Sequence, residues 1–447
     1  MKDFLLISYN FPPYWSPGTV RVGKLTKYLP EFGWRPLVIT ARRSHIPENL
    51  RTPMDDFLKA RIIRLPCNPL DWMDSMKLVL KAMIPARRQP LPRQPSGRVE
   101  KGLPQFRQIY RLGLGAKLSR WMFPIDTYVV WAPFAFLTAL WTLWRRPDIR
   151  LILVSGPPFS QVCVGALLRR LFPSRTFIAD FRDTWIEDYN RYYPTAFHRA
   201  LESAAERFVA KAADALTVVA DDFVPLFEKK YALGSRLHLL HNGFDEDDFR
   251  DLEAAPYAKA GPFTLNYFGG IGEGRNIAGL LRAIQKLKNE GSITEDSFQA
   301  NFHGSVHAYF RDEVQSLGLE GLVKFMPRMP YRVALTQMAS SSALLLVFEN
   351  DPNGGFFSTK VFEYLYVRRP VLVIGPARGA GKFIETHHIG RCVAEDNVEG
   401  IARAILELQQ RHRSEGLPNH AADIQAFSRR RIAGEMAKIF DSLVTPA

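Results

Sequence analysis

The sequence has few of the residues that secreted or metal-binding proteins need. It contains three cysteines in 447 residues, and these lie far apart, at Cys67, Cys163 and Cys392, with no Cys-x-x-Cys spacing. Such a set predicts neither a disulfide framework nor a zinc site. The N-terminal Met1-Lys2-Asp3 carries an acid and leads directly into a strand-like segment, so we expect no signal peptide. A cytoplasmic protein without a bound metal is the expectation.

Long hydrophobic runs are also scarce. The run from Tyr128 to Trp144 holds 17 residues without a charge. A membrane-spanning helix needs roughly 20 apolar residues, and Pro133 lies near the start of this run. We therefore expect a buried or partly interfacial helix here rather than a membrane span.

Acidic residues are depleted in one segment. The chain has 59 Lys and Arg against 45 Asp and Glu, and between Lys77 and Arg120 eleven cations accompany only one acid, Glu100. Aromatic side chains are interleaved with these cations up to Phe123. A basic, aromatic insertion over residues 77–123 could dock on an anionic membrane surface, and an insertion packed on its domain is the alternative. No recognition motif accompanies the charge, so we expect no nucleic acid as a partner.

The chain has ample material for more than one core. Its length and its 47% hydrophobic content favour two domains. Short apolar runs alternate with segments of helical period, which predicts βαβ units and an α/β fold with parallel sheets. The expected strands are residues 4–8, 37–40, 62–65, 151–154, 177–179, 216–219, 237–240, 264–268, 298–302, 323–325, 343–348, 371–374 and 392–394.

These strands divide into two Rossmann-like domains. The first covers residues 1–244 and the second 262–423, and residues 245–261 form an acidic, Pro- and Gly-bearing linker. The Asp245–Asp248 stretch within this linker is interpreted as a solvated turn. A helix over residues 424–447 follows the last strand and could pack back on the first domain.

Polar clusters follow strands of the first domain. Gly18 and Arg21 come after the opening strand, Ser155-Gly156-Pro157-Pro158 follows a later one, and Asp180-Phe181-Arg182-Asp183-Thr184-Trp185 follows the next. Two carboxylates flanking an arginine form either a salt-bridge knot or a rim that binds sugar hydroxyls. Trp185 could stack on a pyranose.

The second domain carries a glycine-rich loop, residues 269–276, between a strand and a helix. Its glycines expose backbone N–H groups, and Arg275 adds a cation, so a diphosphate is the natural ligand. The loop matches neither the Gly-x-Gly-x-x-Gly pattern nor a Walker motif. Lys360 could neutralise the same diphosphate, and Glu363, one helical turn later, could accept hydrogen bonds from ribose hydroxyls.

At these residues the chain resembles the family 4 glycosyltransferases, which are retaining enzymes with two Rossmann-like domains facing each other across a cleft (GT-B). The resemblance spans nearly the whole chain. It is carried by Tyr-Asn-Phe-Pro-Pro at 9–13 with Gly18 and Arg21, Ser155–Pro158, Asp180–Trp185, His241–Asp245, the loop at 269–276 and Lys360–Leu365.

The resemblance implies a division of roles between the domains. The second domain would bind a nucleoside diphosphate sugar through Gly269, Gly270, Gly272, Arg275, Lys360 and Glu363, with no cofactor and no obligatory metal. Gly18, Arg275 and Lys360 would lie at the reacting centre. The first domain would bind the acceptor, with Arg21, Ser155, Asp180, Arg182, Asp183 and Trp185 on that side. The family's first acidic residue is replaced by Gly355, so Gly354 and Gly355 would offer backbone N–H groups instead.

The expected function is transfer of a sugar from a nucleoside diphosphate sugar to a glycan or polyprenyl-linked acceptor, in cell-surface polysaccharide or glycolipid synthesis. The expected location is cytoplasmic, at the inner face of the membrane. Two alternatives share the fold. A nucleotide-sugar epimerase would need a base, for which His303 and Asp183 are candidates. A degenerate, non-catalytic scaffold is suggested by Gly355.

Overall fold

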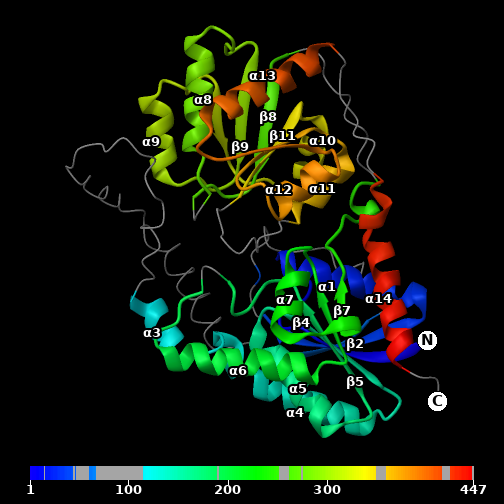
Figure 1. The fold of residues 1–447 in the computed structure, drawn as a ribbon. Coiled ribbons are helices and arrows are strands. Elements are labelled where there is room, and N and C mark those ends of the chain that lie inside the picture. Colours follow the sequence, from blue (N-terminus) through cyan, green and yellow to red (C-terminus); the bar gives the residue numbers. More distant parts are fainter. Residues whose placement is uncertain are drawn as a thin grey trace.

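The computed structural model describes residues 1–14, 16–43, 46, 60–66, 114–188, 191–250, 261–272, 275–348, 359–414 and 423–444. Within these residues the chain forms two α/β domains, each built on a parallel sheet (Figure 1). The predicted α/β fold with two parallel sheets is confirmed. Most of the insertion, with Arg107 and Arg111, and both Gly354 and Gly355 lie outside the described residues.

The first sheet has seven parallel strands in the order β3-β2-β1-β4-β5-β6-β7. Its strands are β1 Lys2–Ile7, β2 Trp34–Arg42, β3 Arg61–Pro66, β4 Leu151–Gly156, β5 Thr176–Phe181, β6 Ala215–Val218 and β7 Leu237–Leu239. The helices are α1 Pro17–Tyr28, α3 Leu114–Met122, α4 Ala132–Arg145, α5 Phe159–Leu171, α6 Ala196–Ala212 and α7 Phe223–Tyr231, with short 3-10 turns η1 Leu29–Phe32, η5 Thr127–Val130 and η6 Gly234–Arg236.

Helices cover both faces of this sheet, which is why its strands are almost continuously apolar. Successive side chains of β1 point to opposite faces: Leu5 and Ile7 join the core under α4, α5 and α7, and Phe4 and Leu6 join the core under α1. The helix α14, Arg429–Leu443, completes the second core, with Phe440 packing against Phe4 and Trp34. The C-terminal helix therefore crosses back to the first sheet (Figure 1).

The second sheet has six parallel strands in the order β10-β9-β8-β11-β12-β13. They are β8 Phe263–Phe268, β9 Phe298–His303, β10 Val323–Met326, β11 Ala343–Val347, β12 Val371–Ile374 and β13 Gly390–Val393. Its helices are α8 Ala278–Asn289, α9 Ala308–Ser316, α10 Tyr331–Ser340, α11 Lys360–Val367, α12 Ala380–Thr386 and α13 Val398–Ser414. Each of the thirteen predicted strands falls on one of the strands observed in the described part of the chain.

The segment after the first sheet corrects one prediction. Asp245 is buried rather than solvated, because it accepts a short hydrogen bond from the Tyr28 hydroxyl and lies 2.5 Å from Lys24 Nζ and 3.0 Å from Lys27 Nζ. Burial alone would raise the pKa of Asp245, but these partners on α1 lower it to about 2. The 3-10 turn η7, Glu246–Asp248, is thereby fixed to α1.

The uncharged run from Tyr128 to Trp144 folds as η5 followed by α4. No helix among the described residues is long and apolar enough to cross a bilayer.

Candidate active site

The glycine loop after β8 is built around a close contact between backbone and cation. Gly269 has a φ of +153°, in the region that favours glycine, and a Cβ on this residue would collide with Lys360 Nζ. The Gly269 N–H donates to the His303 carbonyl oxygen at 2.9 Å, and the Ile271 N–H donates to that of Ser305 at 2.8 Å. The loop is thus pinned to the end of β9, and the first residue of α11 is brought against it.

Two cations gather at this loop. Arg275 Nη1 donates to the Gly270 carbonyl oxygen at 3.3 Å, and Lys360 Nζ lies 5.3 Å from the centre of the Tyr267 ring. The Tyr267 hydroxyl donates to the same Gly270 oxygen at 3.1 Å. Burial, with Arg275 nearby, lowers the pKa of Lys360 to about 8 although Glu363 opposes the shift. A second anion at this place would relieve the repulsion between the two cations.

Glu363 lies one helical turn beyond Lys360 and is buried. The Tyr331 hydroxyl donates to Glu363 Oε1 at 3.0 Å. Burial raises the pKa of Glu363 to about 7, and the hydrogen bond from Tyr331 and the charge of Lys360 counteract only part of that rise. The carboxyl group and the ammonium group both have pKa values shifted toward neutrality, as is typical of functional sites.

The structure therefore brings together the predicted donor-side residues that it describes. Gly269 and Gly270 contact or bond the two cations, the Arg275 N–H donates to the Gly272 carbonyl oxygen at 3.1 Å, and Lys360 and Glu363 share α11. Tyr267 and Tyr331 are members that the sequence analysis missed. Aromatic residues at such positions give no signal in the sequence that separates them from core residues.

The polar cluster at the ends of β4 and β5 corrects the predicted acceptor side. Asp180 is fully buried and accepts from Arg21 Nη2 at 2.8 Å, Ser155 Oγ at 2.6 Å and Thr217 Oγ1 at 2.7 Å. Burial alone would raise the pKa of Asp180, but Arg21 and the two hydroxyl groups hold it below its ordinary value. Arg21 and Ser155 are also buried. These three residues form a salt-bridge knot, and the prediction that they face an acceptor is wrong.

Trp185 also belongs to the core. Its side chain has no exposed surface, stacks on Phe159 with ring centres 4.7 Å apart, and donates from Nε1 to Glu202 at 2.9 Å. The prediction that Trp185 stacks on a sugar is wrong, because both its ring face and its N–H group are occupied inside the domain.

Arg182, in contrast, reaches the start of α1. Its guanidinium donates to the Gly156 carbonyl oxygen at 3.3 Å and to that of Pro157, and a Cβ on Gly18 would collide with Arg182 Nη1. Gly18 is therefore a position of close approach, where any larger residue would displace this guanidinium. Asp183 is exposed beside it. Roles for Gly18, Arg182 and Asp183 near the ligands stay predictions.

The carboxyl edge of the first sheet meets the second domain next to this site. His241, just after β7, has its ring 6.5 Å from that of Phe362, 6.1 Å from that of Phe383 and 5.6 Å from that of Phe427. Phe362 lies in α11, between Lys360 and Glu363. The helix that carries the two ionisable groups is thus in contact with the edge of the first sheet at which parallel-sheet proteins bind ligands.

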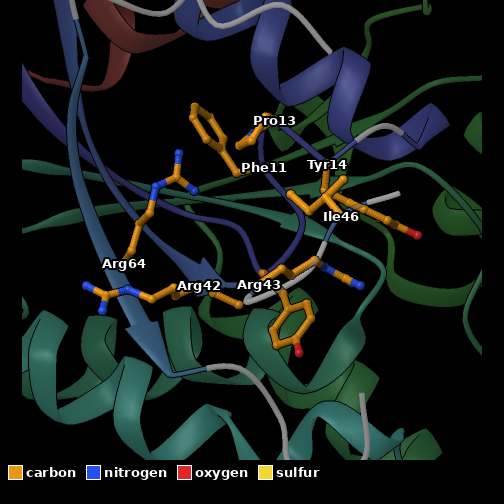
Figure 2. Close-up of a pocket in the computed structure, with 9 residues that line it drawn as sticks. Phe11, Pro13, Tyr14, Arg42, Arg43, Ile46 and Arg64 are labelled. Atoms are coloured by element: carbon orange, nitrogen blue, oxygen red, sulfur yellow. The ribbon is translucent and has the colours of Figure 1, made fainter. Parts of the chain in front are cut away.

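Three arginines at the same edge were missed by the sequence analysis. Figure 2 shows a pocket whose labelled residues include Arg42, Arg43 and Arg64, which come from the ends of β2 and β3. The predicted strands ended at residues 40 and 65, so Arg42 and Arg43 fell outside the first of them. The usable signal was a pair of arginines following one strand and a third within its expected neighbour.

Comparison with known proteins identifies the family. Residues 18–243, just over half of the chain, match the family described as "Glycosyl transferase 4-like domain". The chain belongs to this family. None of the curated proteins searched matches it.

Solved structures of glycosyltransferases share the fold of this family member along its whole length. Sucrose-phosphate synthase from Thermosynechococcus elongatus has 15% sequence identity and a TM-score of 0.60, with 99% of both chains covered. WaaG, a glycosyltransferase involved in lipopolysaccharide biosynthesis, has 14% identity and a TM-score of 0.55, with 98% of this chain and 99% of that chain covered. S. aureus TarM, crystallised with UDP, α-GlcNAc-glycerol and Fondaparinux, has 11% identity and a TM-score of 0.58, with 99% and 100% covered. At these identities the likeness supports the two-domain GT-B fold.

Proposed function

We propose that this glycosyltransferase moves a sugar from a nucleoside diphosphate sugar to a glycan or polyprenyl-linked acceptor, with retention of anomeric configuration and without a metal ion. The observation that carries the proposal is the cluster of Gly269, Arg275, Lys360 and Glu363 at the carboxyl edge of the second sheet. The structural neighbour crystallised with UDP supports a nucleotide donor. The neighbour involved in lipopolysaccharide biosynthesis supports a role in glycolipid or polysaccharide synthesis.

In this proposal the cations act on the leaving group. As the bond between the sugar and the diphosphate breaks, negative charge develops on the diphosphate, and Arg275 and Lys360 stabilise it in a poorly solvated place. Backbone N–H groups of the glycine loop contribute in the same sense. Glu363, held by Tyr331, accepts hydrogen bonds from the ribose hydroxyls and so positions the nucleoside.

The test is calorimetry with UDP and GDP, followed by an assay of free nucleoside diphosphate with and without candidate acceptors. Binding of one nucleotide that is lost in Lys360→Met and kept in Lys382→Met, a change at an exposed lysine of α12, is expected. Release of nucleoside diphosphate only with an acceptor distinguishes transfer from epimerisation. Absence of nucleotide binding would leave the scaffold interpretation.

We further propose that the enzyme works at an anionic membrane surface and meets it through α4. Phe134, Leu137, Trp141 and Trp144 of α4 are each more than half exposed, and their spacing of three, four and three residues places them on one helix face. Arg145 lies with its guanidinium 5.0 Å from the Trp141 ring centre. Aromatic and aliphatic side chains exposed in this way match the headgroup region of a bilayer.

The charges around α4 suit an anionic surface. The four helices α3, α4, α5 and α6 carry eight Lys or Arg, and their only acids, Glu202 and Glu206, are buried. Figure 1 shows α4, α5 and α6 on one side of the first sheet, away from α1 and α14. The cations of these helices can therefore approach anionic headgroups without repulsion from exposed helix acids.

This proposal moves the predicted contact from the insertion to α4. Of the three insertion arginines, Arg120 is described, and it is partly buried, donating to the Ile125 carbonyl oxygen at 2.8 Å. The test is sedimentation with phosphatidylglycerol vesicles. Trp141→Ser combined with Trp144→Ser is expected to weaken binding at least tenfold, and Val333→Ser, an exposed apolar residue of α10, is expected to leave it unchanged. Equal binding of both variants would exclude α4 as the contact.

A further inference from the structure

A pocket of about 260 Å³ opens at the carboxyl edge of the first sheet (Figure 2). Its walls come from the loop after β1 and from the ends of β2 and β3, three strands that are neighbours in the sheet although far apart in the sequence. The lining residues are Tyr9, Phe11, Pro13, Tyr14, Ala41, Arg42, Arg43, Ile46 and Arg64. The pocket therefore has three guanidinium groups and three aromatic rings.

The loop after β1 holds two of the guanidinium groups in place. Arg43 Nη2 donates to Asn10 Oδ1 at 2.9 Å, and its guanidinium lies 3.8 Å from the centre of the Tyr14 ring. Arg64 Nη2 donates to the Pro12 carbonyl oxygen at 2.9 Å, and Figure 2 shows its side chain extending toward Phe11 and Pro13. Because these bonds fix the side chains, little conformational entropy remains to be lost when a ligand binds.

The positive charge of the pocket is not neutralised by the described part of the protein. Among the described residues, no acidic side chain forms an ion pair with Arg42 or Arg64. Burial, and then the nearby charge of Arg42, lower the pKa of Arg64. Two cations that repel each other in a concave, partly desolvated place favour an anion between them. Arginine also offers a planar set of N–H donors that suits the oxygens of a phosphate or a carboxylate.

The donor has cations of its own, because Arg275 and Lys360 lie at the second sheet. The pocket is at the corresponding edge of the first sheet, on the same loop that leads through Ser16 to Gly18 and α1. Resting on the proposed transferase function, we infer that this pocket is an acceptor subsite and that it binds an anionic group of the acceptor, a phosphate or a carboxylate. Tyr9, Phe11 and Tyr14 then contact the apolar or sugar part beside that group.

The experiment separates this site from the donor site. In the full-length Lys360→Met protein, calorimetric titration with inorganic pyrophosphate and with glucuronate reports on the pocket. The double variant R42Q/R64Q, made in that background, is expected to weaken binding of the preferred probe at least tenfold. The matched control is R61Q, an exposed arginine at the opposite end of β3. A second pair, R42K/R64K, keeps the charge and is expected to retain part of the affinity that R42Q/R64Q loses.

Each outcome bears on the inference. Tighter binding of pyrophosphate assigns a phosphate-bearing acceptor, and tighter binding of glucuronate assigns an acidic glycan. The inference is overturned if neither probe binds, if R42Q/R64Q binds like R61Q, or if R42K/R64K loses as much affinity as R42Q/R64Q. Titration of otherwise wild-type R42Q/R64Q with UDP and GDP tests the donor site independently, so failure of the proposed function would be seen as absent nucleotide binding even where the pocket binds its probe.

Discussion

The two sheets each bury a carboxylate beside a cation, and the two pairs behave in opposite ways. In the first sheet, Asp180 is held by Arg21, Ser155 and Thr217, and its pKa lies below the ordinary value. In the second sheet, Glu363 has one printed hydrogen bond, from Tyr331, and its pKa rises to about 7, while that of Lys360 falls to about 8. The same residue types therefore make a satisfied structural centre in one domain and an unsatisfied one in the other.

The difference lies in how many partners compensate for burial. A carboxylate that accepts several hydrogen bonds and faces an arginine can be buried as an ion at little net cost. A lysine that faces another cation, and a glutamate with few donors, gain more from a ligand than from the protein. Residues of this kind are typical of functional sites, where local stability is given up for binding.

The largest effect is expected from breaking the satisfied pair. Asp180→Asn leaves the buried Arg21 without its counter-charge, so the free energy of unfolding should fall by about 3–5 kcal/mol, measured by urea denaturation at pH 7. The control is Asp183→Asn, at the exposed acid three residues later, which should change it by less than about 0.5 kcal/mol. Equal stability of the two variants would mean that the Asp180 cluster is not the structural centre described above.

The unsatisfied centre should respond in activity rather than in stability. Lys360→Met removes one of the two cations that face the leaving diphosphate, so the rate of sugar transfer should fall by about 10²–10³. The free energy of unfolding should change little, because the buried ammonium group already has a lowered pKa. Lys382→Met is the control for both measurements. A stability loss as large as that of Asp180→Asn would remove the contrast between the two domains.

A third buried acid, Asp245, allows the contrast to be tested by pH. Its pKa of about 2 lies below its ordinary value near 3.8, so the stability it contributes is present above pH 4 and is lost as the pH falls toward 2. The corresponding loss is about 2 kcal/mol. Urea denaturation between pH 5 and pH 2 should show this loss in the wild type.

The matched variant for this measurement is Asp245→Asn. It should be less stable than the wild type at pH 7 and should lose less stability on acidification. Parallel pH curves for the two proteins would show that Asp245 is not held by Lys24 and Lys27 in the way the structure indicates.

The sequence predicted the sheets well because strand positions depend on local patterns. Buried parallel strands are short apolar runs between helices, and every one of these runs was visible. The donor-side residues were also visible, since glycines and a cation after a buried strand have few structural explanations. What the sequence could not show is the direction of a side chain at a strand end. Asp180 and Trp185 point into the domain, and nothing in Asp180–Trp185 distinguishes that orientation from an outward one.

The arginine pocket was missed for a different reason. Arg42 and Arg64 belong to strands β2 and β3, and they become neighbours only through the sheet order β3-β2-β1. A parallel sheet also allows pairing beyond the most apolar residues, so β2 runs from Trp34 to Arg42 rather than over residues 37–40 alone. Strand ends are where sequence patterns are least informative and where ligands bind, so the errors concentrate at the site.

The smallest expected effect is also the most specific to the unsatisfied centre. Lys360 in the free enzyme is charged below its pKa of about 8 and loses its proton above it, so nucleotide affinity should decline as the pH rises beyond 8, by up to tenfold per unit. Glu363 raises that pKa and Arg275 lowers it. The alkaline decline should therefore begin at lower pH in Glu363→Gln and at higher pH in Arg275→Gln, and it should vanish in Lys360→Arg, because a guanidinium stays protonated throughout. Calorimetric titration with UDP or GDP from pH 6 to pH 10 measures all four proteins, and identical profiles would show that Lys360 does not face the diphosphate.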